Sequence, residues 1–142
     1  MKRVIFICLM CFLCSCANKK LVATEKKPLY EIIAQKQYGG AKIRFFEIIS
    51  NPQEFGMIKN DPDLKNKVKP DDILNANFLL LNMGEKLSGG YSISIDKVEE
   101  TGKNIIVTIK EKGPAPDAIV TTALTNPYTV VKINSKKEII IK

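Results

Sequence analysis

The chain has 142 residues, with 22 Lys and Arg against 15 Asp and Glu, and it contains four Cys but no His and no Trp. The lack of His excludes a histidine-based catalytic triad and an imidazole zinc site. All four Cys lie within the first 16 residues, so the rest of the chain has no thiol nucleophile, no disulfide and no Cys-ligated metal. The length fits one domain.

The N-terminal segment has the pattern of an export signal. Two basic residues precede the ten apolar residues 4–13, a length that suits a signal peptide and is too short to span a bilayer. The sequence LCSC at 13–16 follows and resembles the lipobox of bacterial lipoproteins. It predicts a signal peptide at 1–15 and a lipid, such as palmitate, on Cys16. An ordinary secretory signal with incidental Cys is the alternative.

The remaining chain is predicted to be a tethered domain in the bacterial cell envelope. Residues 16–27 are polar and rich in Lys, as in a flexible tether, and residues 28–142 are predicted to form a single domain. Ala17 does not resemble an inner-membrane retention signal, so we expect the outer membrane, facing the periplasm. Because the lysines are scattered and Arg44 is the only arginine after the signal, we expect no nucleic-acid partner.

The first part of the domain is predicted to hold a hairpin. Residues 29–35 and 41–49 have strand-like sequences, and the Gly39-Gly40 pair lies between them.

One helix is predicted after this hairpin. The sequence NPQE at 51–54 places Asn at the N-cap, Pro at the first helical position and Glu three residues after the Asn. This pattern predicts a short helix near 52–60 that ends at Asp61-Pro62. Residues 60–72 are polar and are predicted to form an exposed loop.

The rest of the chain has a β pattern. Residues 77–83 are almost continuously apolar, as in a central strand covered on both faces, whereas 91–95 and 105–109 alternate as in a hairpin. The fold class is therefore mainly β, an antiparallel β-sandwich or partly open barrel of about eight short strands with one short helix. Further strands are predicted at 119–124, 128–133 and 137–142.

No group of residues predicts catalysis. Ser88 near Lys86 is a Ser-Lys pair in a Gly-rich loop, but nothing in the sequence desolvates the lysine, so we interpret it as a turn serine and a solvated lysine. The adjacent acidic pairs at 71–72 and 99–100 are interpreted as solvating turns. We expect no enzyme activity, no metal and no cofactor.

Three loops form a candidate protein-binding surface: 84–90, 113–117 and 125–128. Glycines in the first adopt positive φ readily, two prolines pre-order the second, and Tyr128 in the third suits an interface. The alternative is that these are plain connections, with Tyr91 and Tyr128 at the edge of the core. The predicted partner-binding residues are Gly84, Glu85, Lys86, Ser88, Gly89, Gly90, Tyr91, Pro114, Pro116, Asp117, Asn126, Pro127 and Tyr128.

The same loops carry a family resemblance. The sequences GEKLSGGY at 84–91, KEKGPAPD at 110–117 and VTTALTNPY at 120–128 resemble the PrcB C-terminal domain of accessory lipoproteins in bacterial protease complexes. Residues 38–40 and 42–59 also match longer versions of that family. The resemblance implies association with a protease as the protein partner, and it supplies no catalytic residues. Together with a membrane anchor through the lipid on Cys16, it predicts a non-enzymatic accessory subunit.

A weaker likeness gives the alternative function. The sequences SGGY at 88–91 and NPY at 126–128 are similar to two loops of chagasin-type protease inhibitors, although the arginine of those inhibitors is missing. In this alternative the chain inhibits a protease through the loops 84–91, 113–117 and 125–128.

Overall fold

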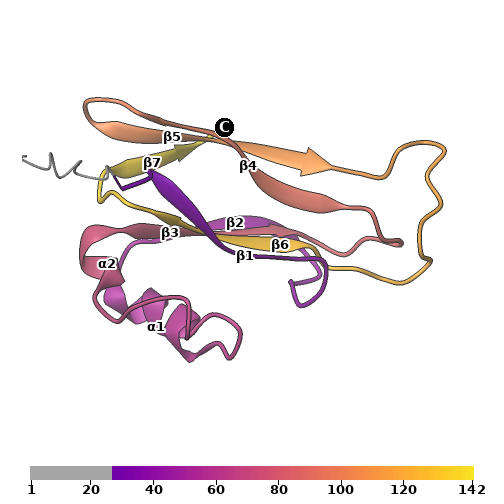
Figure 1. Ribbon diagram of the computed structural model, residues 1–142, viewed down its shortest axis with the longest axis horizontal. Coiled ribbons are helices and arrows are strands. Elements are labelled where there is room, and N and C mark those ends of the chain that lie inside the picture. Colours follow the sequence, from indigo (N-terminus) through magenta and orange to yellow (C-terminus); the bar gives the residue numbers. More distant parts are fainter. Residues whose placement is uncertain (1–26) are drawn as a thin grey trace, which may run out of the picture.

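The computed structural model describes residues 27–142 (Figure 1). The predicted signal peptide, the lipidation site at Cys16 and the tether up to residue 26 lie outside these residues. The described part contains seven strands in two sheets and two short helices. The elements are β1 (Tyr30–Lys36), β2 (Arg44–Ile49), α1 (Pro52–Asn60), α2 (Asp72–Asn75), β3 (Asn77–Met83), β4 (Ser92–Glu100), β5 (Asn104–Lys112), β6 (Tyr128–Ile133) and β7 (Glu138–Ile141).

The elements form three layers (Figure 1). A four-stranded antiparallel sheet of order β1-β6-β3-β2 lies in the middle. The two helices cover one of its faces, and a three-stranded sheet of order β4-β5-β7 covers the other. The mainly β prediction is therefore confirmed as two stacked sheets without a closed barrel. Strands β5 and β7 run parallel, however, which the antiparallel prediction did not include.

The central sheet separates two hydrophobic cores because its side chains alternate between its faces. Phe78 of β3 belongs to the core under the helices, where its ring stacks on Phe55 of α1 with centroids 4.8 Å apart. Leu79 and Leu81 of the same strand belong to the core between the sheets. The predicted central strand covered on both faces is thus confirmed, and the β4–β5 hairpin is confirmed as well.

The predicted hairpin of the first two strands is wrong. Strand β1 pairs with β6 and β2 pairs with β3, so the two strands occupy opposite edges of the sheet. The connecting segment is bound to a distant part of the chain instead. Asn126 N–H donates to the Gln37 carbonyl, and Gly40 N–H donates to the Asn126 carbonyl.

The strand predicted at 119–124 is also wrong. Residues 113–127 form one long loop between β5 and β6, and most side chains of 119–124 are exposed. The β-branched residues that suggested a strand have no neighbouring strand to pack against, and strand propensity depends on such packing.

The predicted helix near 52–60 is confirmed as α1. The Asn51 side chain accepts a hydrogen bond from Glu54 N–H at 2.9 Å, as the capping pattern required. The predicted exposed loop at 60–72 is wrong in part, because Leu64 and Val68 are buried in the core under the helices. Within residues 27–142, no helix has the length and apolar character that a membrane crossing needs.

A buried ion pair attaches the short helix α2 to the central sheet. Lys132 of β6 lies 2.7 Å from Asp72 of α2, and their side chains are only 11% and 14% exposed. Burial raises the pKa of Asp72, but hydrogen bonds from Lys132 and from Lys69 N–H outweigh it and hold the pKa below its usual value. Asp72 therefore does not solvate a turn, as the sequence suggested, but anchors a helix.

Candidate functional site

The first two predicted loops lie together at one end of the stacked sheets, on the right in Figure 1. Lys86 and Thr125 form an isolated antiparallel bridge with N–H···O distances of 2.8 and 2.9 Å. Gly89 N–H donates to the Thr121 carbonyl at 3.0 Å. These bonds hold the loop 84–91 against the long loop 113–127, and we call the joined pair the loop end.

The glycines of the loop end allow the two loops to pack against each other. Gly90 has φ +87°, and a Cβ at this position would lie 3.0 Å from the Pro114 Cβ atom. A Cβ on Gly89 would lie 2.7 Å from the Thr121 Oγ1 atom. The close approach that the glycines permit is thus between parts of the same chain.

Three large aliphatic side chains protrude from the loop end. Leu87 is 81% exposed, Leu124 is 54% exposed and Ile119 is fully exposed. Leu87 follows, and Leu124 precedes, the bridge between Lys86 and Thr125, so backbone hydrogen bonds keep them close together. Leu87 and Leu124 thus form an exposed apolar pair, and exposed apolar side chains that lie together mark interaction surfaces. The prediction named none of the three, although apolar residues within Gly- and Pro-rich loops are a readable signal.

The other predicted residues of these loops differ in accessibility. Glu85, Gly90, Pro116 and Asp117 are exposed, Lys86, Ser88, Tyr91 and Pro114 are half-buried, and Gly84 and Gly89 are buried. Asp117 is the only charged residue from 113 to 127. Low charge is typical of the central part of a protein interface.

Lys86 and Ser88 have separate partners. The Lys86 Nζ atom lies over the ring of Tyr91, 5.6 Å from its centroid. The Ser88 Oγ donates to the Gly89 carbonyl at 3.2 Å, and the Ser88 carbonyl accepts from Thr125 Oγ1 at 2.9 Å. These contacts serve the packing of the loop end.

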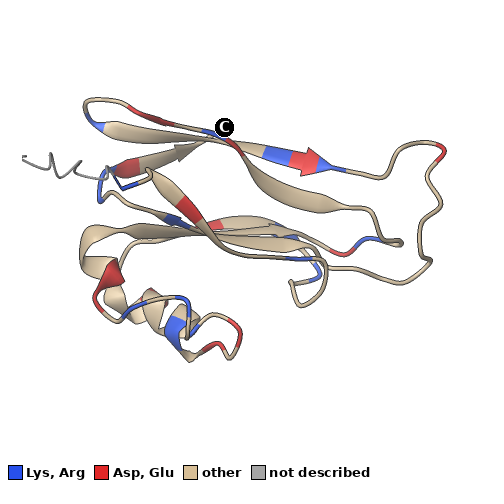
Figure 2. Cartoon of the chain, viewed as in Figure 1, with Lys and Arg blue, Asp and Glu red and all other residues tan. Residues whose placement is uncertain are grey.

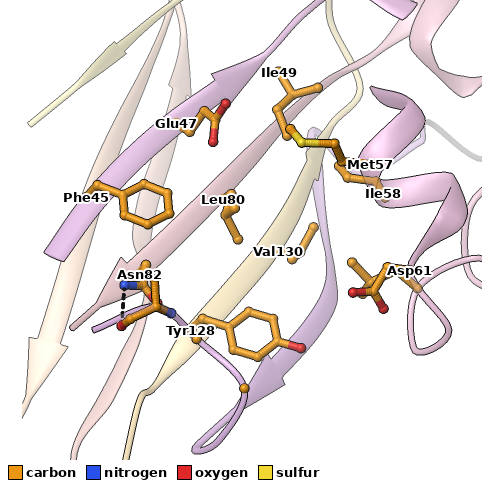
Figure 3. Close-up of a pocket in the computed structure, with 14 residues that line it drawn as sticks. Phe45, Glu47, Ile49, Met57, Ile58, Asp61, Leu80, Asn82, Tyr128 and Val130 are labelled. Atoms are coloured by element: carbon orange, nitrogen blue, oxygen red, sulfur yellow. Dashed lines mark hydrogen bonds between the residues drawn. The ribbon is translucent and has the colours of Figure 1, made fainter. Parts of the chain in front are cut away.

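The third predicted loop faces another part of the molecule. Asn126 is half-buried and bound to the segment 37–40, Pro127 is buried, and Tyr128 is only 9% exposed. Tyr128 points to the helix side of the central sheet (Figure 3). The structure therefore brings the first two loops together and turns Pro127 and Tyr128 away from them. The sequence NPY at 126–128, on which the chagasin-type likeness partly rested, does not share a surface with the other two loops.

A pocket opens on the helix side, between α1 and the central sheet (Figure 3). Its volume is about 360 Å³. Its lining is mostly apolar, with two carboxylates and one phenol. The lining residues are Gly39, Gly40, Ala41, Phe45, Glu47, Ile49, Met57, Ile58, Asp61, Leu64, Leu80, Asn82, Tyr128 and Val130.

Asn82 closes one end of this pocket. Its buried amide accepts from Ala41 N–H at 2.9 Å and donates to the carbonyls of Ala41 and Ile43. A Cβ on Gly40 would lie 2.3 Å from the Asn82 Oδ1 atom and 2.6 Å from the Asn126 carbonyl oxygen. Gly40 therefore lies where the pocket wall meets the chain that leads to the loop end, and only glycine fits there.

Burial and three charged residues act on the pKa of Tyr128. Burial raises the pKa of Tyr128, Asp61 and Asp63 raise it further, and Lys36 lowers it, with the balance above the usual value. Lys36 and Asp63 form an exposed ion pair beside the pocket. The hydrogen bond between them raises the pKa of Lys36 and lowers that of Asp63.

Charge is mixed over the rest of the described chain. Separate blue and red segments are scattered over both sheets and the helices, and most of each strand is tan (Figure 2). Among residues 27–142, no three acidic, Cys or His side chains come together as metal ligands would.

Comparison with known proteins identifies one segment. Residues 78–134 match the family model described as PrcB C-terminal. The match runs from β3 through β6 and contains the whole loop end, whereas β1, β2, both helices and β7 lie outside it. No curated protein and no solved structure matches the chain.

Proposed function

We propose, from the PrcB C-terminal domain at residues 78–134, that the chain is a non-enzymatic accessory subunit that binds a protease partner through its loop end. The domain itself points to a role associated with a protease complex. Attachment to the envelope membrane through a lipid on Cys16 is part of the same proposal.

One observation carries the binding role. The loop end joins two loops by backbone hydrogen bonds and presents Leu87, Ile119 and Leu124 to solvent. Burying such side chains in a partner contributes about 25 cal/mol per Å² of apolar surface. Because the prolines and the bridge already order the loops, little conformational entropy remains to be lost on binding.

The membrane role rests on the sequence alone. The lipobox-like LCSC precedes a polar segment long enough to hold the domain away from the bilayer. Several acyl chains on one Cys give lasting attachment, whereas a single chain binds reversibly. Cys16→Ser is expected to move the protein from the membrane fraction to the soluble fraction on cell fractionation. Unchanged membrane recovery of that variant would contradict the anchor.

The binding role is tested by co-purification of an active protease from native membranes. The double variant Leu87→Ser, Ile119→Ser should lose most of the protease activity that co-purifies with the chain. Leu74→Ser is the matched control, because Leu74 is a similarly exposed aliphatic residue on α2, away from the loop end. Equal recovery with both variants would contradict the proposed surface. Loss of protease activity on adding the chain at 1:1 stoichiometry would identify an inhibitor instead.

A further inference from the structure

The pocket beneath α1 combines an apolar interior with an unpaired carboxylate. We infer that it binds a small organic cation, namely an apolar body that carries one ammonium group. This site is independent of the loop end, because it lies on the helix side of the central sheet and is built largely by elements outside the family match.

The size of the pocket fits a small molecule. Its volume of about 360 Å³ lies within the range of roughly 300–1,000 Å³ that ligand pockets occupy. Strands β2, β3 and β6 form the floor of the pocket. Their side chains Phe45, Leu80 and Val130 point into the space between the sheet and α1 (Figure 3). An aromatic or branched aliphatic body would replace water against these side chains.

The charge of the pocket favours a ligand with a positive charge. Glu47 lies on the pocket face of β2 between Phe45 and Ile49, and it is half-buried. Within residues 27–142, no hydrogen bond or ion pair engages its carboxylate. No Lys or Arg lines the pocket, although the sequence carries a net charge of +7. A half-buried carboxylate without a cation favours a cationic ligand.

Two polar groups on the opposite wall suit the same ligand. Asp61 ends α1 and carries a second negative charge, while its Oδ1 atom accepts from Asp63 N–H at 2.8 Å. The Tyr128 hydroxyl points toward Asp61 (Figure 3). A neutral phenol accepts a hydrogen bond from an ammonium group without repelling its charge.

The rim of the pocket permits entry. Met57 of α1 lines the pocket and is 57% exposed, so its flexible side chain can adapt to different apolar bodies. A ligand can therefore reach Glu47 without any opening of the hydrophobic core.

An NMR titration of the isotopically labelled full chain tests the inference with three probes of similar shape. Phenethylamine is the cation, phenethyl alcohol the neutral analogue and phenylacetate the anion. We expect phenethylamine to bind with a dissociation constant of about 1 mM, as suits so small a ligand, with shifts at Met57 and Tyr128. The alcohol should bind at least about fivefold more weakly, and phenylacetate should not bind.

Glu47→Gln should weaken phenethylamine to the affinity of the alcohol, whereas Glu99→Gln, which removes the same charge from β4 on the other sheet, should leave it unchanged. If Glu47→Gln does not fold, Asp61→Asn tests the second carboxylate and should also weaken the binding of phenethylamine. This variant keeps an oxygen that accepts the hydrogen bond from Asp63 N–H. Equal binding of the three probes, or shifts confined to residues outside the pocket, would overturn the inference. So would the absence of any shift at about 20 mM amine, which is far above the expected dissociation constant.

Discussion

The loop end and the pocket beneath α1 are built in different ways. The loop end lies wholly within the PrcB C-terminal match and is held by backbone hydrogen bonds between two Gly- and Pro-rich loops. The pocket is formed by side chains from strands and a helix that lie far apart in the sequence and mostly outside the match. A surface made of contiguous motifs can be read from a sequence, whereas a cavity between distant elements requires the fold.

The largest expected effect tests the contact between Gly40 in the pocket wall and Asn126 in the loop end. Gly40→Ala places a Cβ against the Asn82 side chain and the Asn126 carbonyl, and the latter is backbone that cannot rotate away. We expect the free energy of unfolding to fall by about 4 kcal/mol, measured by urea denaturation. Gly56→Ala is the control, because a Cβ at that helical position meets no atom within 4 Å. It should stabilise the protein by up to about 1 kcal/mol through helix propensity.

A somewhat smaller loss of stability is expected when the ion pair between Asp72 and Lys132 is broken. Asp72→Asn leaves Lys132 buried without its partner and should lower the free energy of unfolding by about 3 kcal/mol near pH 7. The pKa of Asp72 is lower in the folded chain than the roughly 3.9 of an unfolded chain. The ionised carboxylate therefore stabilises the fold above that pH, and this contribution is lost as the pH falls through the folded-state pKa.

Urea denaturation of the wild type and of Asp72→Asn at several pH values separates charge from packing. The difference between the two proteins should shrink as the pH is lowered below about 4. Lys132→Met leaves the buried Asp72 carboxylate without its partner, so near pH 7 it should be about as damaging as Asp72→Asn. A constant difference across pH would show that the ion pair does not govern the attachment of α2.

The smallest of the three effects concerns the loop end. Gly90→Val introduces a side chain at φ +87° and brings its Cβ to 3.0 Å from Pro114, so we expect a loss of about 2 kcal/mol. Because the two loops would separate, recovery of the protease partner should also fall. Gly102→Val is the control, since its Cβ meets nothing within 4 Å. Wild-type stability and binding in Gly90→Val would contradict the packing described for this loop.

The parts of the fold that follow from local sequence were predicted correctly. The NPQE cap, the apolar run of β3 and the alternation in β4 and β5 are local patterns that do not depend on partners. The pairing of β1 with β2 was predicted wrongly. The Gly39-Gly40 pair indicates a turn, but a turn also occurs between strands that lie at opposite edges of a sheet. Sequence periodicity does not specify which strands become neighbours.

For the candidate site, too, local motifs were predicted and contacts between distant residues were not. The two contacting loops were predicted from their motifs. Tyr128 was assigned to the same surface, whereas it belongs to the core under the helices, whose other members lie far away in the sequence. Glu47 was missed as well. A charged residue on the otherwise apolar face of Phe45 and Ile49 is the signal that marks it. The Asp72–Lys132 pair, 60 residues apart, left no local pattern.

The central claim is that the loop end contacts a protease, and site-specific photocrosslinking tests it most directly. A photoreactive phenylalanine analogue placed at Ile119 is predicted to crosslink to the protease subunit in native membranes. The same analogue at Ile140, an exposed aliphatic residue on β7, should not crosslink to that subunit. Crosslinks from position 140 and none from position 119 would contradict the account.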